Sequence, residues 1–397
     1  MTALPGWARW SSAGEDAPWT VGIEEEVMLL EPDGWALASR IDDVLPALST
    51  EVAERAAAET HGSAIELASR PHATAGAAAQ ELEALRERLE GDLAPLGLRA
   101  GVAGTHPFAQ WTDVRVSGGP RYQSIYDSMR ELARREPTFA LHVHVAVPGA
   151  EAAVDALRGL RAHLPVLLAL SANSPFWQGR DTGLASARTP VFSTFPRTGI
   201  PRPFASYADY VEAVDVLLRC EAIPEPTFLW WDARLQPRFG TLEVRVMDAQ
   251  TRAPDTAALA ALVQCTVRLE ATEGFASPRQ ALSMEALDEN RFLASRDGTR
   301  AMLIDIDGDA RIPMADTLEA LLVACAPHAR DLGCEAELAG VRGLLDDPGD
   351  ERQRRRGGVA RGDPVGDALG TVVEALAADF TGSRAAASGT PGAGEQR

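Results

Sequence analysis

The chain has 397 residues, of which 38 carry a fixed positive charge and 57 carry a carboxylate, so its formal net charge is −19. Such an acidic excess disfavours nucleic-acid binding, because contacts with phosphates need a basic face. The sequence contains no lysine, so every fixed positive side chain is an arginine. This absence excludes active sites that depend on a P-loop lysine, a Schiff-base lysine or a carbamylated lysine.

The cysteines and the apolar segments indicate the compartment. Cys220, Cys265, Cys325 and Cys334 show no Cys-x-x-Cys spacing, and most of them lie in apolar helical patterns. We therefore expect free thiols in a reducing environment. The N-terminus lacks the apolar core of a signal peptide, and no apolar run approaches the roughly 18 residues of a membrane span. These patterns predict a cytoplasmic protein with no membrane partner.

Short strands alternate irregularly with helices, which differs from the strict order of a parallel α/β fold. In chain order we expect strands over 21–30 and 63–69, a helix over 79–93, a strand over 141–147, a helix over 151–170 broken by Pro165, an ordered loop over 171–188, a helix over 207–220, a strand over 241–247, and helices over 255–272 and 316–331. The pattern predicts an α+β fold with a largely antiparallel sheet.

The ends of the chain and one internal stretch differ in composition. We expect a single domain over 18–380, preceded by an N-terminal segment over 1–17 and followed by a disordered tail over 381–397, which is rich in small and polar residues. The stretch 346–363 is charged, contains several glycines and has no apolar period, which predicts a loop.

Polar residues recur on one face of the expected strands. Side chains at i and i+2 of a strand project to the same side. This pairing groups the following residues opposite apolar neighbours: Glu24 with Glu26, His142 with His144, Glu243 with Arg245, and, more weakly, Glu66 alone. The simplest interpretation of one such strand is that its polar side chains lie on a solvent-exposed face of the sheet. The same choice in four strands is less typical of a solvated face, because neighbouring carboxylates repel one another unless a cation lies among them.

We therefore predict a divalent-metal site with carboxylate and imidazole ligands. Such a donor set suits Mg²⁺ or Mn²⁺ better than Zn²⁺. Glu25 points to the apolar face of its strand. Either an edge position or an ion pair with an arginine would explain it.

Arginines complement the carboxylates. Arg180 and Arg188 lie in the loop over 171–188, and Arg245 follows Glu243 on the same strand face. With lysine absent, guanidinium groups are the only fixed cations that can hold a phosphate. The run from Arg352 to Arg356 either closes over a nucleotide or is a solvated stretch of charge, and the second reading is favoured.

Several motifs together resemble the glutamate–cysteine ligase type 2 family, in its carboxylate–amine ligase branch. They are GIEEE at 22–26, HVHV at 142–145, SPFWQGRDTG at 174–183, WWDARLQPRFGTLEVRVMDAQ at 230–250, ENRFLASRDG at 289–298 and ERQRR at 351–355. The resemblance runs in order from about residue 18 to residue 380. It implies a glutamine-synthetase-like fold, in which a curved, mainly antiparallel sheet forms an active-site funnel and helices pack on its outer face.

The resemblance also implies an ATP-dependent reaction, in which an acyl phosphate forms from an acid and an amine displaces the phosphate. The acid is typically glutamate and the amine typically cysteine, with weak activity in this branch. By motif match, the metal ligands are Glu24, Glu26, Glu66 and Glu243, with His144 (or His142) on the metal or on a phosphate. By the same match, Arg245 and Arg188 contact phosphate, and Arg180 contacts substrate or phosphate. Trp231 either lines the nucleotide pocket or packs in the core. A homo-oligomer is compatible with the sequence.

The chain departs from the family pattern at Phe139–Leu141, Leu184 and Ala187. We interpret these positions as walls of the pocket, so the resemblance leaves the substrates open. Three other classes also remain: a metal-dependent amidohydrolase, which often opens with a His-x-His pair, a phosphagen-kinase-like phosphotransferase, and a catalytically silent regulator with the ligase fold. The hydrolase would need further histidine ligands besides this pair. For His61, His72 and His106, turn or capping roles are the alternative to metal ligation.

Overall fold

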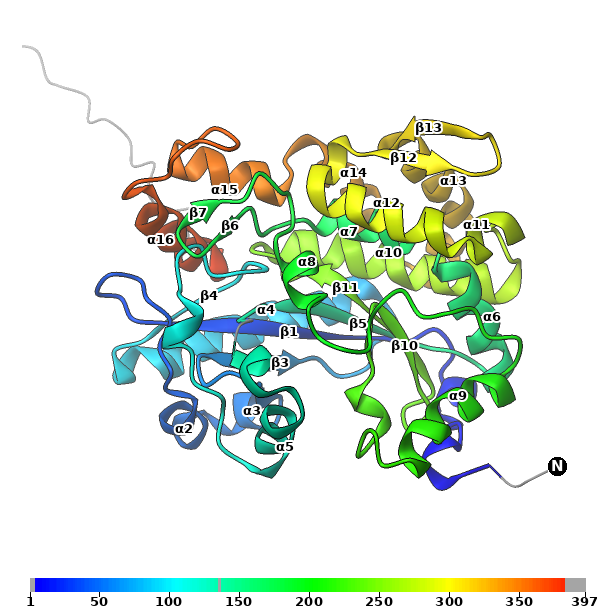
Figure 1. The fold of residues 1–397 in the computed structure, drawn as a ribbon, viewed down its shortest axis with the longest axis horizontal. Helices are drawn as coiled ribbons and strands as arrows, with labels where there is room; N and C mark the ends of the chain where they lie inside the picture. The colour runs from blue at the N-terminus through cyan, green and yellow to red at the C-terminus, as the bar shows by residue number, and fades with distance from the viewer. Residues whose placement is uncertain (1–3, 135–136, 383–397) are drawn as a thin grey trace, which may run out of the picture.

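The computed structural model describes residues 4–134 and 137–382, and all structural statements concern these residues. Its centre is a seven-stranded antiparallel sheet in the order β10-β11-β5-β1-β3-β2, with β4 also paired to β1 (Figure 1). The strands of this sheet are β1 (Val21–Leu30), β2 (Ala56–Ala58), β3 (Ala64–Ala68), β4 (Arg99–Gly101), β5 (Ala140–Ala146), β10 (Ala233–Gln236) and β11 (Thr241–Asp248). The observed fold confirms the α+β class and the antiparallel sheet.

Smaller strand pairs lie outside this sheet. They are β6 (Phe176–Trp177) with β7 (Arg180–Asp181), β8 (Thr198–Gly199) with β9 (Trp230–Trp231), and β12 (Met302–Asp305) with β13 (Ala310–Pro313). The β6–β7 hairpin belongs to the segment for which the sequence predicts an ordered loop.

The α-helices of the described chain lie around the sheet and are connected by loops and short 3-10 turns. Those in the N-terminal half are α1 (Ala13–Asp16), α2 (Ile41–Val44), α3 (Thr50–Ala53), α4 (Ala75–Leu93), α5 (Pro120–Met129), α6 (Ala150–Leu160), α7 (Leu164–Ser171) and α8 (Arg188–Phe192). The later ones are α9 (Tyr207–Arg219), α10 (Ala253–Thr272), α11 (Pro278–Leu282), α12 (Met284–Asp297), α13 (Met314–Leu332), α14 (Glu335–Asp346), α15 (Gly349–Gly357) and α16 (Ala368–Phe380).

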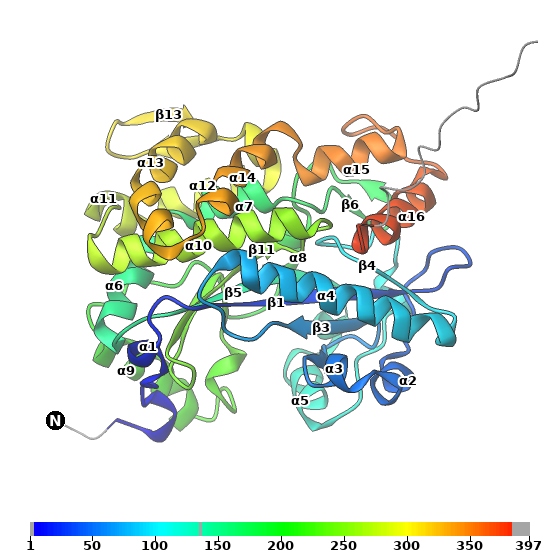
Figure 2. The same cartoon turned by 180° about the vertical axis from the view of Figure 1, so that it is seen from behind.

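Helices α4 and α10 cover one face of the sheet, as the view from behind shows (Figure 2). The side chain of Thr74 accepts a hydrogen bond from the amide of Ala77 and so caps α4. Its leucines at 82, 85, 89 and 93 are buried at helical spacing. Helix α10 is apolar around most of its circumference, because α4, α6, α13, α14 and the sheet all pack against it. The opposite face of the sheet is left for loops and short helices.

A buried ion pair joins α4 to the apolar face of β1. Glu25 accepts from Nε of Arg86 at 2.8 Å and from its Nη2, and both side chains are fully buried. Arg86 also donates to the carbonyl oxygens of Gln250 and Thr251, at 2.7 and 3.0 Å, just after β11 ends. Of the two explanations for Glu25, the ion pair with an arginine is therefore the one observed.

The prediction of a loop over 346–363 is wrong for residues 349–357, where the chain forms α15. The helix has no apolar stripe, and buried ion pairs hold it instead. Arg354 binds Asp181 and Asp350, and Arg352 binds Asp255. The favoured reading of this arginine run as solvated charge is thus wrong for Arg352 and Arg354, which are 7% and 1% exposed, whereas Arg355 and Arg356 reach the surface.

Other expected elements appear with shifted ends. The expected helix over 151–170 is two helices, and Pro165 lies in the first turn of α7, where its missing N–H leaves no helical bond unmade. The N-terminal segment packs on the domain, because the indole of Trp7 donates to Asp215 and that of Trp10 to the carbonyl oxygen of Val147. Most of the expected tail, residues 383–397, lies outside the described residues.

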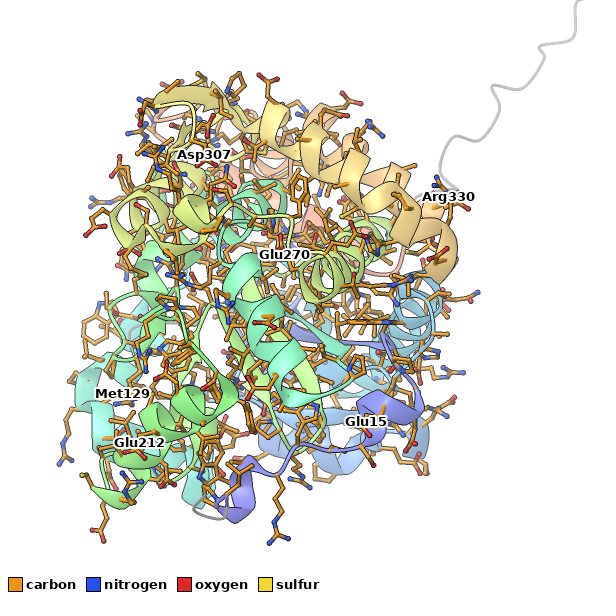
Figure 3. The ribbon with its side chains drawn as sticks, turned by 90° about the vertical axis from the view of Figure 1, so that its right-hand side faces the viewer. Glu15, Met129, Glu212, Glu270, Asp307 and Arg330 are labelled. Atoms are coloured by element: carbon orange, nitrogen blue, oxygen red, sulfur yellow. The ribbon has the colours of Figure 1, made fainter. Side chains whose placement is uncertain are left out.

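Of the charged residues labelled in Figure 3, Glu270 is buried, whereas Glu15, Glu212, Asp307 and Arg330 are exposed. All the cysteines are free thiols; Cys265, Cys325 and Cys334 are buried, and Cys220 is exposed. Among the helices of the described residues, none combines the length and the apolar character that crossing a bilayer requires.

Candidate active site

The register of the sheet brings the predicted polar side chains together on its open face. Across β1 and β5, Glu24 lies opposite His142, and across β1 and β3, Glu26 lies opposite Glu66. Across β5 and β11, His144 lies opposite Glu243. Directly opposed residues in an antiparallel pair have side chains in contact range. The metal ligands that the sequence predicts therefore meet across four adjacent strands.

A β-bulge in β11 places Arg245. Val143 of β5 pairs with Val244 of β11, and Leu141 pairs with Met247. One residue of β5, His142, therefore lies opposite two residues of β11. The bulge lets Arg245 stay on the same face as Glu243 while Val246 is buried.

These side chains line a cavity of about 370 Å³. Its charged and imidazole side chains are Glu24, Glu26, Glu59, Glu66, His61, His142, Arg188, Arg234 and Arg245. Aromatic and aliphatic side chains complete the wall, among them Tyr122, Ile125 and Met129 of α5 and Trp230 of β9. Glu243 and His144 are absent from this wall and lie beneath it, 1% and 8% exposed.

Two groups of ligand atoms in the cavity have the spacing of a metal site. Glu24, His142 and Glu243 form one group, and Glu26, Glu66 and His142 form the other, with the ligand atoms of each within 4.8 Å of one another. Nε2 of His142 and Nε2 of His144 are buried and make no hydrogen bond. Buried polar atoms without a partner are rare in folded proteins. The carboxylate-rich donor set and these unpaired nitrogens fit a divalent cation such as Mg²⁺ or Mn²⁺.

The electrostatics of the Glu26–Glu66 pair also favour a cation. Burial raises the pKa of Glu66 well above its usual range, and the charges of Glu24, Glu59 and Glu26 raise it further. Burial and Glu59 raise the pKa of Glu26 to about 8, although Arg188 and the amide of Ala140 oppose the rise. Like charges in a low-dielectric pocket disfavour ionisation unless a cation compensates them.

Glu24 and Glu243 behave in the opposite way. Burial tends to raise the pKa of Glu24, yet the charge of His144, a hydrogen bond with His142 and the close approach of Nε2 of His144 hold it well below its usual range. Burial likewise opposes ionisation of Glu243, but Arg234 and Arg245 hold its pKa well below its usual range. The surroundings thus favour the ionised form of Glu24 and Glu243, whereas Glu26 and Glu66 favour the protonated form unless a cation lies beside them.

The imidazoles of His142 and His144 also differ from each other in pKa. Burial, and then the charge of Arg245, lowers the pKa of His142 to about 4, so this ring is neutral and able to ligate. For His144, burial lowers the pKa, but Glu24 and Glu243 raise it above its ordinary value overall. Nε2 of His144 lies 3.3 Å from Oε1 of Glu24, and its Nδ1 lies 3.1 Å from Oγ1 of Thr241. His142 is thus the better ligand, and His144 holds Glu24 in place.

Arg188 is the first residue of α8, and its side chain lines the cavity. Its Nη1 and Nη2 donate to the carbonyl oxygens of Val246 and Arg245, each at 3.2 Å, and its Nε has no partner. The loop before it is fixed by Asp248, whose carboxylate accepts from the hydroxyls of Ser174 and Ser186 at 2.6 and 2.9 Å. Arg188 is therefore preorganised with an N–H group still available.

Two predicted site residues lie elsewhere. Arg180 is exposed in β7 and is not among the residues that line the cavity. Trp231 turns away and packs its ring against those of Phe204 and Tyr210, at centroid distances of 5.9 and 6.5 Å. Its neighbour Trp230 lines the cavity instead, because successive residues of a strand face opposite sides.

The expected pocket-wall departures also lie off the wall. None of Phe139–Leu141, Leu184 and Ala187 lines the cavity, although the amide of Ala140 donates to Oε2 of Glu26 at 2.7 Å. Of these positions, Ala140 therefore contacts the site through its backbone.

Sequence reasoning missed Glu59 and Arg234. Arg234 lies opposite Glu243 on β10, and its Nε donates to Oε2 of Glu243 at 2.6 Å. The alternation of Arg234 and Gln236 around Leu235 in the WWDARLQ motif is the signal that would have found Arg234. Glu59 precedes β3 without any strand pattern of its own, so only the fold shows it.

The scattered histidines have structural partners. His106 receives the amides of Phe108 and Ala109 on Nδ1, and His72 pairs with Glu81 at 2.6 Å. His61 lines the cavity, but its Nε2 binds the carbonyl oxygen of Ala133 at 3.0 Å. The additional histidine ligands that a metal-dependent hydrolase needs are therefore missing from the described part of the cavity.

A family model and several curated proteins match most of this chain. The model of glutamate–cysteine ligase family 2 matches residues 20–366. Two proteins of Rubrobacter xylanophilus, named "putative glutamate–cysteine ligase 2-1" and "2-3", are 37% and 44% identical over 94% and 83% of this chain, and the match spans 97% and 89% of their own lengths. A Rhodospirillum rubrum protein named "putative glutamate–cysteine ligase 2" is 35% identical over 94% of this chain and 98% of its own length.

Solved structures show the fold. A glutamate–cysteine ligase of Francisella tularensis in complex with AMP superposes with a TM-score of 0.63 at 13% identity, covering 92% of this chain and 89% of that one. A bifunctional glutathione synthetase of Pasteurella multocida gives a TM-score of 0.62 at 13% identity, covering 93% of this chain and 53% of that one. The matched family model, the curated relatives and the shared architecture agree with the resemblance carried by the sequence motifs. The chain belongs to glutamate–cysteine ligase family 2.

Proposed function

We propose that this protein is an ATP-dependent carboxylate–amine ligase that joins glutamate, through its γ-carboxylate, to cysteine. The observation that carries the proposal is the meeting of paired carboxylates, a neutral imidazole and buried arginines in one cavity of the ligase family's fold. Carboxylates alone would repel a triphosphate, and arginines alone would not hold a metal. The combination suits a nucleotide that carries a divalent cation.

The reaction has two steps. The substrate carboxylate attacks the γ-phosphorus of ATP, which forms an acyl phosphate and releases ADP. The amine then attacks the acyl carbon, phosphate leaves with the bonding electrons, and the amine loses a proton, which gives the amide. Activation is needed because an ionised carboxylate resists attack by an amine.

The residues of this chain would act mainly through positioning and charge. The guanidinium groups of Arg188 and Arg245 would contact the transferred phosphoryl group, where planar N–H donors match phosphate oxygens. Glu24, Glu26, Glu66 and His142, with Glu243 below them, would hold the divalent cation, which when bound neutralises the charge of the polyphosphate. The aromatic ring of Trp230 offers a surface for a substrate or for the base.

The wall formed by α5 sets the other side of the cavity. Tyr122, Ile125 and Met129 give this wall its largely apolar character, and Glu59 also lines the cavity. We propose that the amino-acid substrates bind between this wall and the metal ligands. We further propose a cytoplasmic location, since the reaction uses ATP and a free thiol.

The test is a phosphate-release assay with ATP, Mg²⁺, glutamate and cysteine, with the product identified by mass spectrometry. Release that needs both amino acids, together with a product of the mass of γ-glutamylcysteine, supports the proposal. Omission of one amino acid at a time shows whether release depends on both. A second panel replaces cysteine by other amines. Phosphate release only with another amine would retain the ligase and replace the amine, and no release with any acid–amine pair would contradict the ligase itself.

A further inference from the structure

We propose that the guanidinium of Arg245 holds the place of a divalent cation in the resting cavity, so that metal and nucleotide bind cooperatively. This inference rests on the proposed function, because it concerns the metal and the triphosphate of the same site. It assigns Arg245 a second role besides contact with phosphate: competition with the metal for shared ligand atoms.

The position of one nitrogen carries the argument. Nη1 of Arg245 donates to Oε1 of Glu243 and lies 3.4 Å from Nδ1 of His142. That same Nδ1 lies 3.4 Å from Oε2 of Glu24. Glu24, His142 and Glu243 form the first of the metal-spaced groups. The guanidinium thus occupies the space among the atoms that would ligate a cation.

A cation and this guanidinium exclude each other for two reasons. They would bind the same oxygen of Glu243, and two positive charges a few ångström apart in a buried pocket repel strongly. Arg245 has only 13% of its side chain exposed, so solvent screens little of the repulsion. Metal binding therefore requires Arg245 to leave Glu243.

Glu243 is built to tolerate that departure. Its Oε2 accepts from Nε of Arg234 at 2.6 Å and from Nε2 of Gln236 at 2.7 Å. Oε1 receives Nη2 of Arg234 only at 3.3 Å, so Arg245 is the main partner of this oxygen. When Arg245 moves, Glu243 keeps its charge paired and exposes one oxygen to the metal.

Arg245 in turn needs a new anion. Its Nε already lacks a hydrogen-bond partner, and a buried guanidinium without a counter-charge is costly. The triphosphate of the nucleotide is the anion that the proposed reaction brings to this wall. Metal alone would thus bind against the cost of displacing Arg245, and metal with nucleotide would not. Such coupling is reciprocal, because each ligand must raise the affinity of the other by the same factor.

The test measures Mn²⁺ binding by the loss of the free-ion signal in electron paramagnetic resonance, with and without a non-hydrolysable ATP analogue. The variants are Arg245→Gln and Arg245→Ala, and Arg188→Gln is the matched control. Arg188 lines the same cavity but makes no hydrogen bond to a proposed metal ligand, so its variant reports the general effect of removing one positive charge. Thermal unfolding of each variant checks the fold.

We expect Mn²⁺ alone to bind both Arg245 variants about tenfold more tightly than the parent, and the enhancement by the nucleotide analogue to shrink by a similar factor. Arg188→Gln should tighten Mn²⁺ binding by less than about threefold, since only long-range repulsion is relieved. Equal tightening in the Arg188 and Arg245 variants, or none in the Arg245 variants, overturns the inference while leaving the proposed ligase intact. Absence of Mn²⁺ binding from the parent, with or without the analogue, contradicts both.

Discussion

Arg354 and Asp181, which are 173 residues apart, form a two-point ion pair: Nε and Nη2 of the arginine each lie 2.9 Å from one carboxylate oxygen. The pair joins α15 to the β6–β7 hairpin, which begins the loop that leads to Arg188. Both side chains are almost fully buried, at 2% and 0% exposure. Hydrogen bonds from Arg354 hold the pKa of Asp181 below its usual range although burial tends to raise it. Through this pair, α15 stabilises the loop that leads to Arg188 at the cavity.

We expect Arg354→Gln to lower the free energy of unfolding by about 3 kcal/mol, because it leaves buried carboxylates of Asp181 and Asp350 without their main partner. Urea denaturation followed by circular dichroism measures the change. Arg355→Gln is the control: this neighbour is 59% exposed, and its loss should cost less than about 1 kcal/mol. Similar costs for the two variants would show that the buried pair has no special role.

Replacement of Glu24 by Gln tests the metal ligands. The substitution keeps the size of the side chain but removes the charge that His142 and His144 stabilise. We expect turnover to fall by about 100-fold or more, with the melting temperature nearly unchanged, since positioned charges commonly contribute this much to phosphoryl and acyl transfer. Glu31→Gln, directly after β1 and outside the cavity, should leave turnover as it is. Parental activity in Glu24→Gln would remove Glu24 from the proposed site.

Metal binding should depend on pH through Glu26. Its pKa of about 8 means that the carboxyl is mostly protonated at pH 7 without a cation, so metal binding must release the proton. Glu66, whose pKa is also raised, would release a proton in the same way, so the apparent affinity should rise with pH and should fall by at least about tenfold for each pH unit below about 8.

Calorimetry of Mn²⁺ binding at pH 7 in two buffers of different ionisation enthalpy counts the released protons. Glu26→Gln should release about one proton fewer than the parent protein. A proton count that is the same in the parent and in Glu26→Gln would show that Glu26 does not exchange a proton for the metal.

His106 should make the protein sensitive to acid. Burial lowers its pKa to about 4, below the unfolded value of 6.5, so the unfolded state binds a proton first as the pH falls. The stability that the neutral ring contributes is present above pH 6.5 and is lost progressively between pH 6.5 and about 4, amounting to about 2 kcal/mol between pH 7 and pH 5.

Urea denaturation at pH 7 and at pH 5 measures this loss. His106→Asn keeps an acceptor for the amides of Phe108 and Ala109 but cannot titrate, so its stability should fall by about 2 kcal/mol less over the same interval. His61, with a pKa of about 4, titrates in both proteins and cancels in the comparison. Parallel pH profiles would contradict the assignment to His106.

The alternation of polar and apolar residues was sufficient to predict which side chains of β1, β3, β5 and β11 share a face. Alternation does not give strand order, so the opposition of Glu26 to Glu66 and of His144 to Glu243 had to come from the structure. The bulge in β11 was equally hidden, because an extra residue changes the register without changing the residue types.

The misses share a cause. Glu59 and α15 depend on contacts between segments far apart in the chain, and local pattern carries no information on such contacts. The run from Arg352 to Arg356 resembles a solvated stretch, yet Arg352 and Arg354 pair with Asp255 and Asp181, which lie far away in the chain. The resemblance to the family located the motif of Arg180 but could not say that the side chain points outward.

The contacts of Arg86 have a consequence for the dimensions of the cavity. Strands β1 and β11 are separated by β5, yet from the far side of the sheet this one guanidinium binds Glu25 of β1 and the chain that leaves β11. It therefore helps to set how far apart Glu24 and Glu243 lie. A substitution at position 86 would therefore alter the distance between two proposed metal ligands without changing any residue that lines the cavity.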